Sequence, residues 1–314
     1  MKPILLAVAV LALVGLHPAA DGQKFTEWST PVNLGPVVNS GYTEAGAFIS
    51  KDGLSLFFGS SGRPDGYGGF DLYVCQRDTV DDLWEPAQNL GPEINTSANE
   101  QTPALSVDGH RLYFASDRTG GFGGLDLYVS RRHDKRDDLG WQPPVNLGDA
   151  VNTFYVERGP TLFDDDATAT TTLYFSSTRP GGTGLEDIYT STLQPDETIV
   201  PAVNVPELNS TFNDAVPAVR RDGLELFLCS PRTGQLGGTD LWVATRPSTS
   251  EPWSTPANLG TTVNSTFLDF RAAISFDGTA LYFHSARPGG IGGGITEYDL
   301  YVTTRTKITG RDKK

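Results

Sequence analysis

Residues 106–130 have the sequence SVDGHRLYFASDRTGGFGGLDLYVS, which contains two apolar stretches, each preceded by a glycine-containing turn. The second turn contains Gly120, Gly121, Gly123 and Gly124, and such a loop can cradle phosphate when it opens a helix. Here it runs into Leu125–Val129, whose alternating pattern predicts a strand. The glycines are therefore interpreted as a turn between antiparallel strands, where positive φ angles are often required.

The same pattern recurs along the whole chain. Segments of the form Trp-x-x-Pro-x-Asn-Leu-Gly begin at Trp28, Trp84, Trp141 and Trp253, and in the second the proline lies one residue nearer the tryptophan. The first three are about 56 residues apart, and the last gap spans two such periods. A degenerate copy, IVPAVNVPELNS, lies near residue 200, so the chain contains five repeats. Repeats of this length with four short strands are typical of β-propeller blades.

We therefore expect an all-β fold, a five-bladed β-propeller with four-stranded antiparallel blades, spanning residues 23–306 as a single domain. In the second repeat, residues 100–106 (EQTPALS) are predicted to form the inner strand, residues 111–116 (RLYFAS) the second strand and residues 126–130 (DLYVS) the third strand. The corresponding segments of the other repeats are predicted to form the same strands. The Trp-x-x-Pro segment is predicted to be the outer edge, where proline is tolerated. Because the chain opens with such a segment, Trp28–Gly35 is expected to close the last blade.

Acidic residues recur at one place in every repeat, five residues after an Asn and eight before an Asp. They begin the predicted inner strands and should surround one mouth of the central channel. Each repeat also carries an arginine in its second turn, which is available to pair with the acid. The acids are Glu44, Glu100, Glu157, Asp214 and Asp269, and the arginines are Arg63, Arg118, Arg179, Arg232 and Arg287.

Three interpretations of the acid ring stay open. The acids can pair with the arginines or with backbone between blades, because unpaired like charges at close range are costly. They can instead bind a cation, such as calcium, or a cationic ligand, although no cofactor is expected. They can also serve hydrolysis, which requires two carboxylates in different environments. Arg158, Phe270 and Arg271, each close to a ring acid, break the symmetry mildly, and Arg158 and Arg271 join the acids as candidate binding residues.

Composition restricts the partners and the compartment. The formal net charge of -14 disfavours nucleic acid and anionic lipid surfaces. Residues 1–22 resemble a secretory signal peptide, with cleavage after Ala20 or Gly22, which predicts an exported, periplasmic or secreted bacterial protein without membrane insertion of the mature chain. Residues 307–314 form a polar tail. Cys75 and Cys229 lie in blades that are not neighbours, and both are expected to remain thiols.

The Ser-x-Asp-Gly turn followed by Leu-Tyr-Phe-x-Ser-x-Arg, as in residues 106–118, resembles the WD-repeat-like propeller repeat of TolB-type bacterial envelope proteins. That resemblance implies a propeller that serves as a binding scaffold. It leads us to expect an exported, non-catalytic protein that binds a protein or polysaccharide of the cell envelope. The alternative is a carbohydrate-binding protein or glycoside hydrolase that uses the acidic channel mouth.

Overall fold

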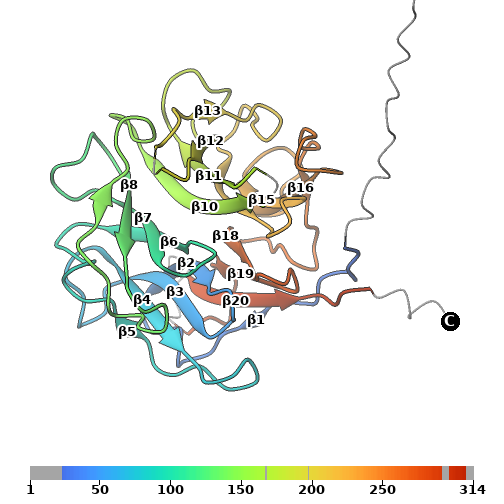
Figure 1. Ribbon diagram of the computed structural model, residues 1–314. Coiled ribbons are helices and arrows are strands. Elements are labelled where there is room, and N and C mark those ends of the chain that lie inside the picture. Colours follow the sequence, from blue (N-terminus) through green and yellow to red (C-terminus); the bar gives the residue numbers. More distant parts are fainter. Residues whose placement is uncertain (1–22, 167, 197, 292–296, 309–314) are drawn as a thin grey trace, which may run out of the picture.

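The computed structural model describes residues 23–166, 168–196, 198–291 and 297–308. These residues form five four-stranded antiparallel sheets, which confirms the predicted all-β, five-bladed propeller. Figure 1 shows the sheets arranged around one axis, and no helix occurs among the residues so described. The predicted signal peptide, residues 1–22, and most of the predicted polar tail lie outside the described residues.

One strand of each sheet lies nearest to the axis. Each of these inner strands contacts the inner strands of its two neighbours, so the five enclose the channel. Each begins within one residue of its ring acid, close to the predicted start. The inner strands are β2 (Thr43–Ile49), β6 (Glu100–Leu105), β10 (Glu157–Asp165), β14 (Ala215–Val219) and β18 (Asp269–Ile274).

The other strands follow outward in the predicted order. The second strands are β3 (Ser55–Ser61), β7 (Arg111–Ser116), β11 (Thr170–Ser177), β15 (Glu225–Ser230) and β19 (Ala280–Ser285). The third strands are β4 (Phe70–Gln76), β8 (Asp126–Arg131), β12 (Asp187–Leu193), β16 (Asp240–Thr245) and β20 (Asp299–Thr304). The outer strands are β5 (Gln88–Asn89), β9 (Val145–Asn146), β13 (Val203–Asn204), β17 (Ala257–Asn258) and β1 (Val32–Asn33).

The aromatic residues of the second and third strands build the core of each blade. Phe114 of β7 stacks on Tyr128 of β8 with ring centroids 6.1 Å apart. Similar stacked pairs join the second and third strands in blades one, three and five. These buried rings explain why the Leu-Tyr-Phe and Asp-Leu-Tyr patterns recur, because each blade must bury the same faces.

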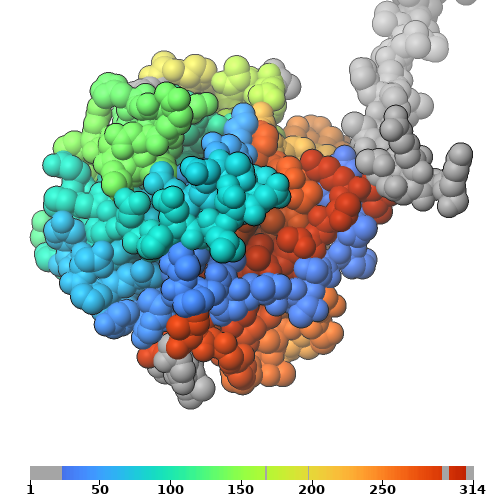
Figure 2. Space-filling view, turned by 90° about the horizontal axis from the view of Figure 1, so that it is seen from below, coloured from blue at the N-terminus to red at the C-terminus, as the bar shows by residue number. Residues whose placement is uncertain are grey.

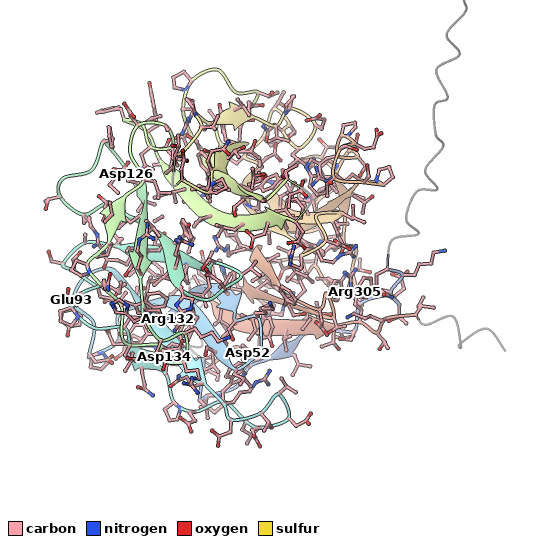
Figure 3. All side chains as sticks on the ribbon, viewed as in Figure 1. Asp52, Glu93, Asp126, Arg132, Asp134 and Arg305 are labelled. Carbon is pink, nitrogen blue, oxygen red and sulfur yellow. The ribbon has the colours of Figure 1, made fainter. Side chains whose placement is uncertain are left out.

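The N-terminal segment closes the ring. Strand β1 pairs antiparallel with β20, with Val32 opposite Val302, and completes the fifth sheet as predicted. The guanidinium carbon of Arg305 lies 3.8 Å from the ring centroid of Phe25 and 4.2 Å from that of Trp28. Figure 2 shows the blue N-terminal segment against the red C-terminal one, and Figure 3 places Arg305 where the two ends meet. The ring therefore depends on contacts between the two ends of the described chain.

Candidate functional site

The five ring acids are completely buried, and each accepts a hydrogen bond from the arginine of its own repeat. The nitrogen–oxygen distances are 2.8 Å for Arg63–Glu44, 3.1 Å for Arg118–Glu100, 3.2 Å for Arg179–Glu157 and 2.6 Å for Arg287–Asp269. Arg232 and Asp214 form the fifth pair. The acid ring is therefore a set of five internal ion pairs rather than a row of open carboxylates.

Glu100 illustrates how fully these carboxylates are used. It accepts hydrogen bonds from the backbone N–H of Thr96 at 2.8 Å, the Thr96 hydroxyl at 2.8 Å and the Ser116 hydroxyl at 2.9 Å, besides Arg118. Arg118 also donates to the carbonyl of Ile94 at 2.6 Å. The pair thus lies within one blade and holds the segment that arrives from the previous blade. The acid–arginine bond was expected to join two blades, and this is wrong, because the acid and its arginine belong to the same repeat.

A second ring of residues lies two positions after the acids, where each inner strand has an irregular register. These residues are Gly46, Thr102, Gly159, Val216 and Arg271, with φ angles of 69°, 53°, 67°, 47° and 54°. They meet at the channel axis. The backbone N–H of Gly159 donates to the Thr102 hydroxyl at 3.2 Å, and a Cβ on Gly159 would lie 2.7 Å from the Cα of Val216. Glycine is therefore required at position 159, while Arg271 brings the one charged side chain of this ring to the axis.

A pocket with a volume of about 220 Å³ lies at the channel mouth where the inner strands begin. Aromatic side chains from blades one and five and polar side chains from blades two, three and five line it. They include Phe70, Gln101, Arg158, Phe270, Arg271, His284 and Tyr298. None of the described lining residues is an aspartate or glutamate, so the walls of this pocket combine aromatic faces with positive charge.

Arg158 follows a ring acid and lies over the ring of Phe270, with its guanidinium carbon 5.7 Å from the ring centroid. It forms two hydrogen bonds of 2.7 Å with the carboxylate of Glu186, which also accepts from the Ser176 hydroxyl at 2.7 Å. Burial alone would lower the pKa of Arg158, but the charge and hydrogen bonds of Glu186 outweigh it and raise the pKa. Arg158 is thus a charged, fixed wall of the pocket.

Arg271 is only 2% exposed and lies deeper in the same pocket. Its Nη2 donates to the carbonyl of Pro103 in β6 at 3.0 Å, across the channel. Its Nε and Nη1 are buried without any hydrogen-bond partner among the described residues. Burial, together with the positive charge of Arg158, lowers the pKa of Arg271 to about 9. The side chain is still charged at neutral pH and has donors to spare.

Two neutral groups surround Arg271. The Nδ1 atom of His284 accepts the backbone N–H of Gly46 at 3.3 Å, and burial followed by the charges of Arg271 and Arg158 lowers the His284 pKa to about 3. The sulfur of Cys229 accepts the backbone N–H of Arg271 at 2.8 Å, and burial raises the Cys229 pKa to about 12. Neither group offsets the charge of Arg271 at pH 7.

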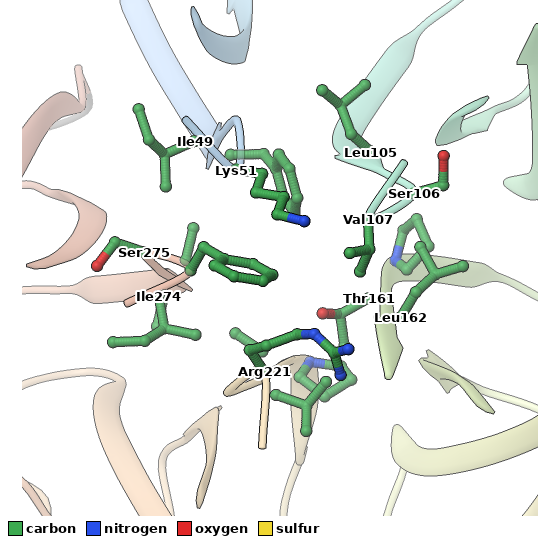
Figure 4. Close-up of a pocket in the computed structure, with 18 of the residues that line it drawn as sticks. Ile49, Lys51, Leu105, Ser106, Val107, Thr161, Leu162, Arg221, Ile274 and Ser275 are labelled. Atoms are coloured by element: carbon green, nitrogen blue, oxygen red, sulfur yellow. The ribbon is translucent and has the colours of Figure 1, made fainter. Parts of the chain in front are cut away.

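The opposite end of the channel has a different character. A cavity of about 70 Å³ there is bounded by Lys51, Arg221 and Phe276, and Arg271 reaches it from within. Figure 4 shows Lys51 and Arg221 pointing toward the centre from different blades. Both cationic groups lie near the Phe276 ring, with Lys51 Nζ 4.7 Å and the Arg221 guanidinium carbon 5.8 Å from its centroid. This cavity is smaller than the pocket at the other mouth, but a larger groove of about 1090 Å³, also bounded by Lys51 and Phe276, adjoins it.

The sequence predicted Arg158 and Arg271 as binding residues, and the structure brings both to one pocket, whereas the five acids lie outside its lining. Sequence reasoning missed Glu186, Phe70, Tyr298 and His284. A signal for the first three exists in the repeats. The residue before the Asp of the third strand is Phe70, Leu125, Glu186, Thr239 or Tyr298, and three of these five form or support the pocket. Positions that vary between repeats thus build the pocket, while invariant ones build the blades.

No group of three or more His, Cys, Asp or Glu residues that could hold a metal ion occurs in the part of the chain that the structure describes. The five acids do not form such a group, because each is enclosed in its own blade. In the same described residues no apolar helix reaches the length that crossing a membrane requires. Both cysteines are free and buried.

The fold is similar to that of solved glycoside hydrolases. An α-L-arabinofuranosidase from Lactobacillus brevis has a TM-score of 0.57 and 18% sequence identity, covering 88% of this chain and 93% of its own. The catalytic domain of a Coprinopsis cinerea GH62 α-L-arabinofuranosidase has a TM-score of 0.54 and 15% identity, with coverage of 89% and 97%. A GH62 hydrolase in complex with xylotriose has a TM-score of 0.54 and 13% identity, with coverage of 88% and 97%. No family model and no curated protein sequence matches the chain.

These similarities correct two expectations. The resemblance to TolB-type repeats was wrong, because the similar structures are propeller glycoside hydrolases. The motif that carried it builds a hairpin turn and a blade core, and neither depends on what the ring binds. The expected non-catalytic scaffold for an envelope macromolecule is also wrong, because the same structures favour the carbohydrate alternative. At such identities they establish the shared fold and assign no residue of the pocket.

Proposed function

We propose that this protein is a carbohydrate-active propeller that binds a saccharide in the pocket lined by Arg158 and Phe270. The observation that carries the proposal is the lining of that pocket, where Phe70, Phe270 and Tyr298 surround the polar side chains of Gln101 and Arg158. Sugar rings have apolar faces that pack on aromatic side chains and hydroxyl edges that need hydrogen-bond partners. This pocket supplies both kinds of contact at one mouth of the channel.

The size of the pocket limits what enters it. Its volume of about 220 Å³ is below the range of about 300–1,000 Å³ that is usual for drug-sized ligands. One sugar unit at the end of a chain or on a branch fits this room better than the middle of a long polymer. The polysaccharide itself would lie across the open mouth, and the predicted signal peptide implies that binding takes place in the periplasm or outside the cell.

Glycoside hydrolysis is the second candidate, and it is favoured by the fold that the chain shares with glycoside hydrolases. Hydrolysis requires a general acid and a second carboxylate that acts as base or nucleophile. Glu186 is the carboxylate beside the pocket, and both of its oxygens accept from Arg158. A hydrolytic role would therefore rest first on Glu186, and Glu186→Gln is the variant that tests it.

Binding is tested by calorimetry with a panel of soluble xylan, arabinoxylan and pectin fragments, and hydrolysis by release of reducing sugar from the same panel. The variant Phe270→Ala removes the aromatic wall, and we expect at least tenfold weaker binding. Phe276→Ala is the matched control, because Phe276 follows the same strand at the opposite end of the channel. Absence of binding to every saccharide, or equal losses in both variants, would contradict the proposal. Hydrolysis that Glu186→Gln abolishes would establish the second candidate.

A further inference from the structure

Among the residues that the structure describes, Arg271 is a buried cation without a balancing negative charge. Arg158 has Glu186, and each turn arginine has its ring acid, but no carboxylate bonds to Arg271 in the described residues. An isolated charge in the interior is expensive, and an unpaired buried donor adds to that cost. Residues that lower the stability of the fold in this way are typically found at functional sites, where the surrounding structure holds them in place.

The repeats show that the fold does not need an arginine there. The equivalent positions in the other four blades are Gly46, Thr102, Gly159 and Val216, all with positive φ. Three are glycine or a small polar residue, and one is valine, so small side chains complete the ring without charge. Arg271 therefore serves something other than the blade, and its N–H groups at Nε and Nη1 are the ones left over.

We infer that Arg271 is the receptor for the carboxylate of an acidic saccharide, so that the ligand of the pocket is a uronic acid unit. This inference rests on the proposed function, since the aromatic walls supply the sugar-binding part of the same pocket. A guanidinium with free N–H groups forms the strong, directional hydrogen bonds that recognise carboxylates. Arg271 is one of the residues that line the pocket, and the described lining contains no competing carboxylate.

The acidic surface of the protein does not oppose this assignment at short range. The formal net charge is -14, but charges more than about 8–10 Å away are screened at physiological salt. At the pocket the nearest charges are Arg158, which is paired with Glu186, and Arg271, which has no carboxylate partner among the described residues. His284 is neutral because its pKa is lowered to about 3. Local charge therefore favours an anion, while the net charge slows its approach.

The inference is tested by calorimetric titration with D-glucuronate and D-galacturonate against D-glucose and D-galactose, at matched ionic strength. We expect the acidic sugars to bind at least about tenfold more tightly than their neutral counterparts, because hydrogen bonds between charged groups are stronger than those between neutral ones. Arg271→Gly should remove this preference. Glycine occupies two equivalent ring positions, so the variant keeps a backbone that the fold already uses. Arg271→Lys keeps the charge without the planar donor group and should retain part of the preference.

Lys51→Gln is the matched control, because it removes one positive charge from the opposite end of the channel. It should keep the preference for acidic sugars. Equal affinity for acidic and neutral sugars in the wild type, or an unchanged preference in Arg271→Gly, would overturn the inference while leaving saccharide binding intact. If no sugar binds but sodium acetate raises the melting temperature of the wild type alone, the ligand is a free carboxylate. That result overturns both the acidic saccharide and the proposed function.

Discussion

Replacing Glu100 by glutamine tests whether the acid ring holds the blades or binds a ligand. The substitution keeps the shape of the side chain, removes its charge and turns one acceptor into a donor. Four hydrogen-bond donors face this carboxylate, which is completely buried. Removing one member of a buried ion pair costs about 3–5 kcal/mol. Arg118 keeps its bond to the Ile94 carbonyl and its side chain is 14% exposed, so we expect the lower end, about 3 kcal/mol.

A loss of about 3 kcal/mol corresponds to a fall in melting temperature of roughly 5 °C for a domain of this size. The measurement is thermal unfolding followed by circular dichroism, supported by urea titration. Glu93→Gln is the control, because Glu93 is exposed on the outer rim (Figure 3) and its replacement should change stability by less than about 0.5 kcal/mol. Glu157→Gln should match Glu100→Gln, since the same contacts recur in its blade.

The same curves are recorded with calcium and with chelator, and we expect no difference between them. Two results would refute the reasoning. A cost below about 1 kcal/mol would mean that the ion pair does not hold the blade. A melting shift that calcium produces in the wild type and Glu100→Gln abolishes would mean that the acids bind a cation.

Three further predictions follow from the closure strand, the thiols and the deep arginine. Deleting residues 23–36 removes β1 and exposes β20 as an edge, so the variant should aggregate or melt at lower temperature; an unchanged melting curve would contradict ring closure by this strand. Cys75 and Cys229 are buried and burial raises both pKa values to about 12, so a thiol reagent at pH 8 should label them only after unfolding, and mass spectrometry of labelled native protein checks this. Glucuronate affinity should be constant from pH 5 to 8 and should fall as the pH rises through about 9, because Arg271 loses its proton there. Arg158 stays charged, and neither His284 nor Cys229 titrates in that range. A flat affinity profile up to pH 10.5 would show that another group binds the carboxylate.

The sequence by itself determined the architecture, because the pattern that encodes one blade occurs five times in the chain. The Trp-x-x-Pro segments, the ring acids and the turn arginines recur at fixed spacing, and each has a local role in one blade. The order of strands and the closure of the ring by Trp28–Gly35 follow from that spacing, and the structure confirms both. Local patterns suffice here because every strand pairs with a neighbour in the chain, except at the one seam where the two ends meet.

Only the tertiary structure decided which residues share the pocket. Phe70, Arg158 and Arg271 are far apart in sequence, and their meeting depends on how five inner strands converge on one axis. The sequence placed the acids at the mouth, yet could not show that their own arginines enclose them, because burial depends on the closed ring. The unbalanced charge of Arg271 is likewise a property of the assembled channel. It arises because four blades bring small or uncharged side chains to the axis where the fifth brings a guanidinium.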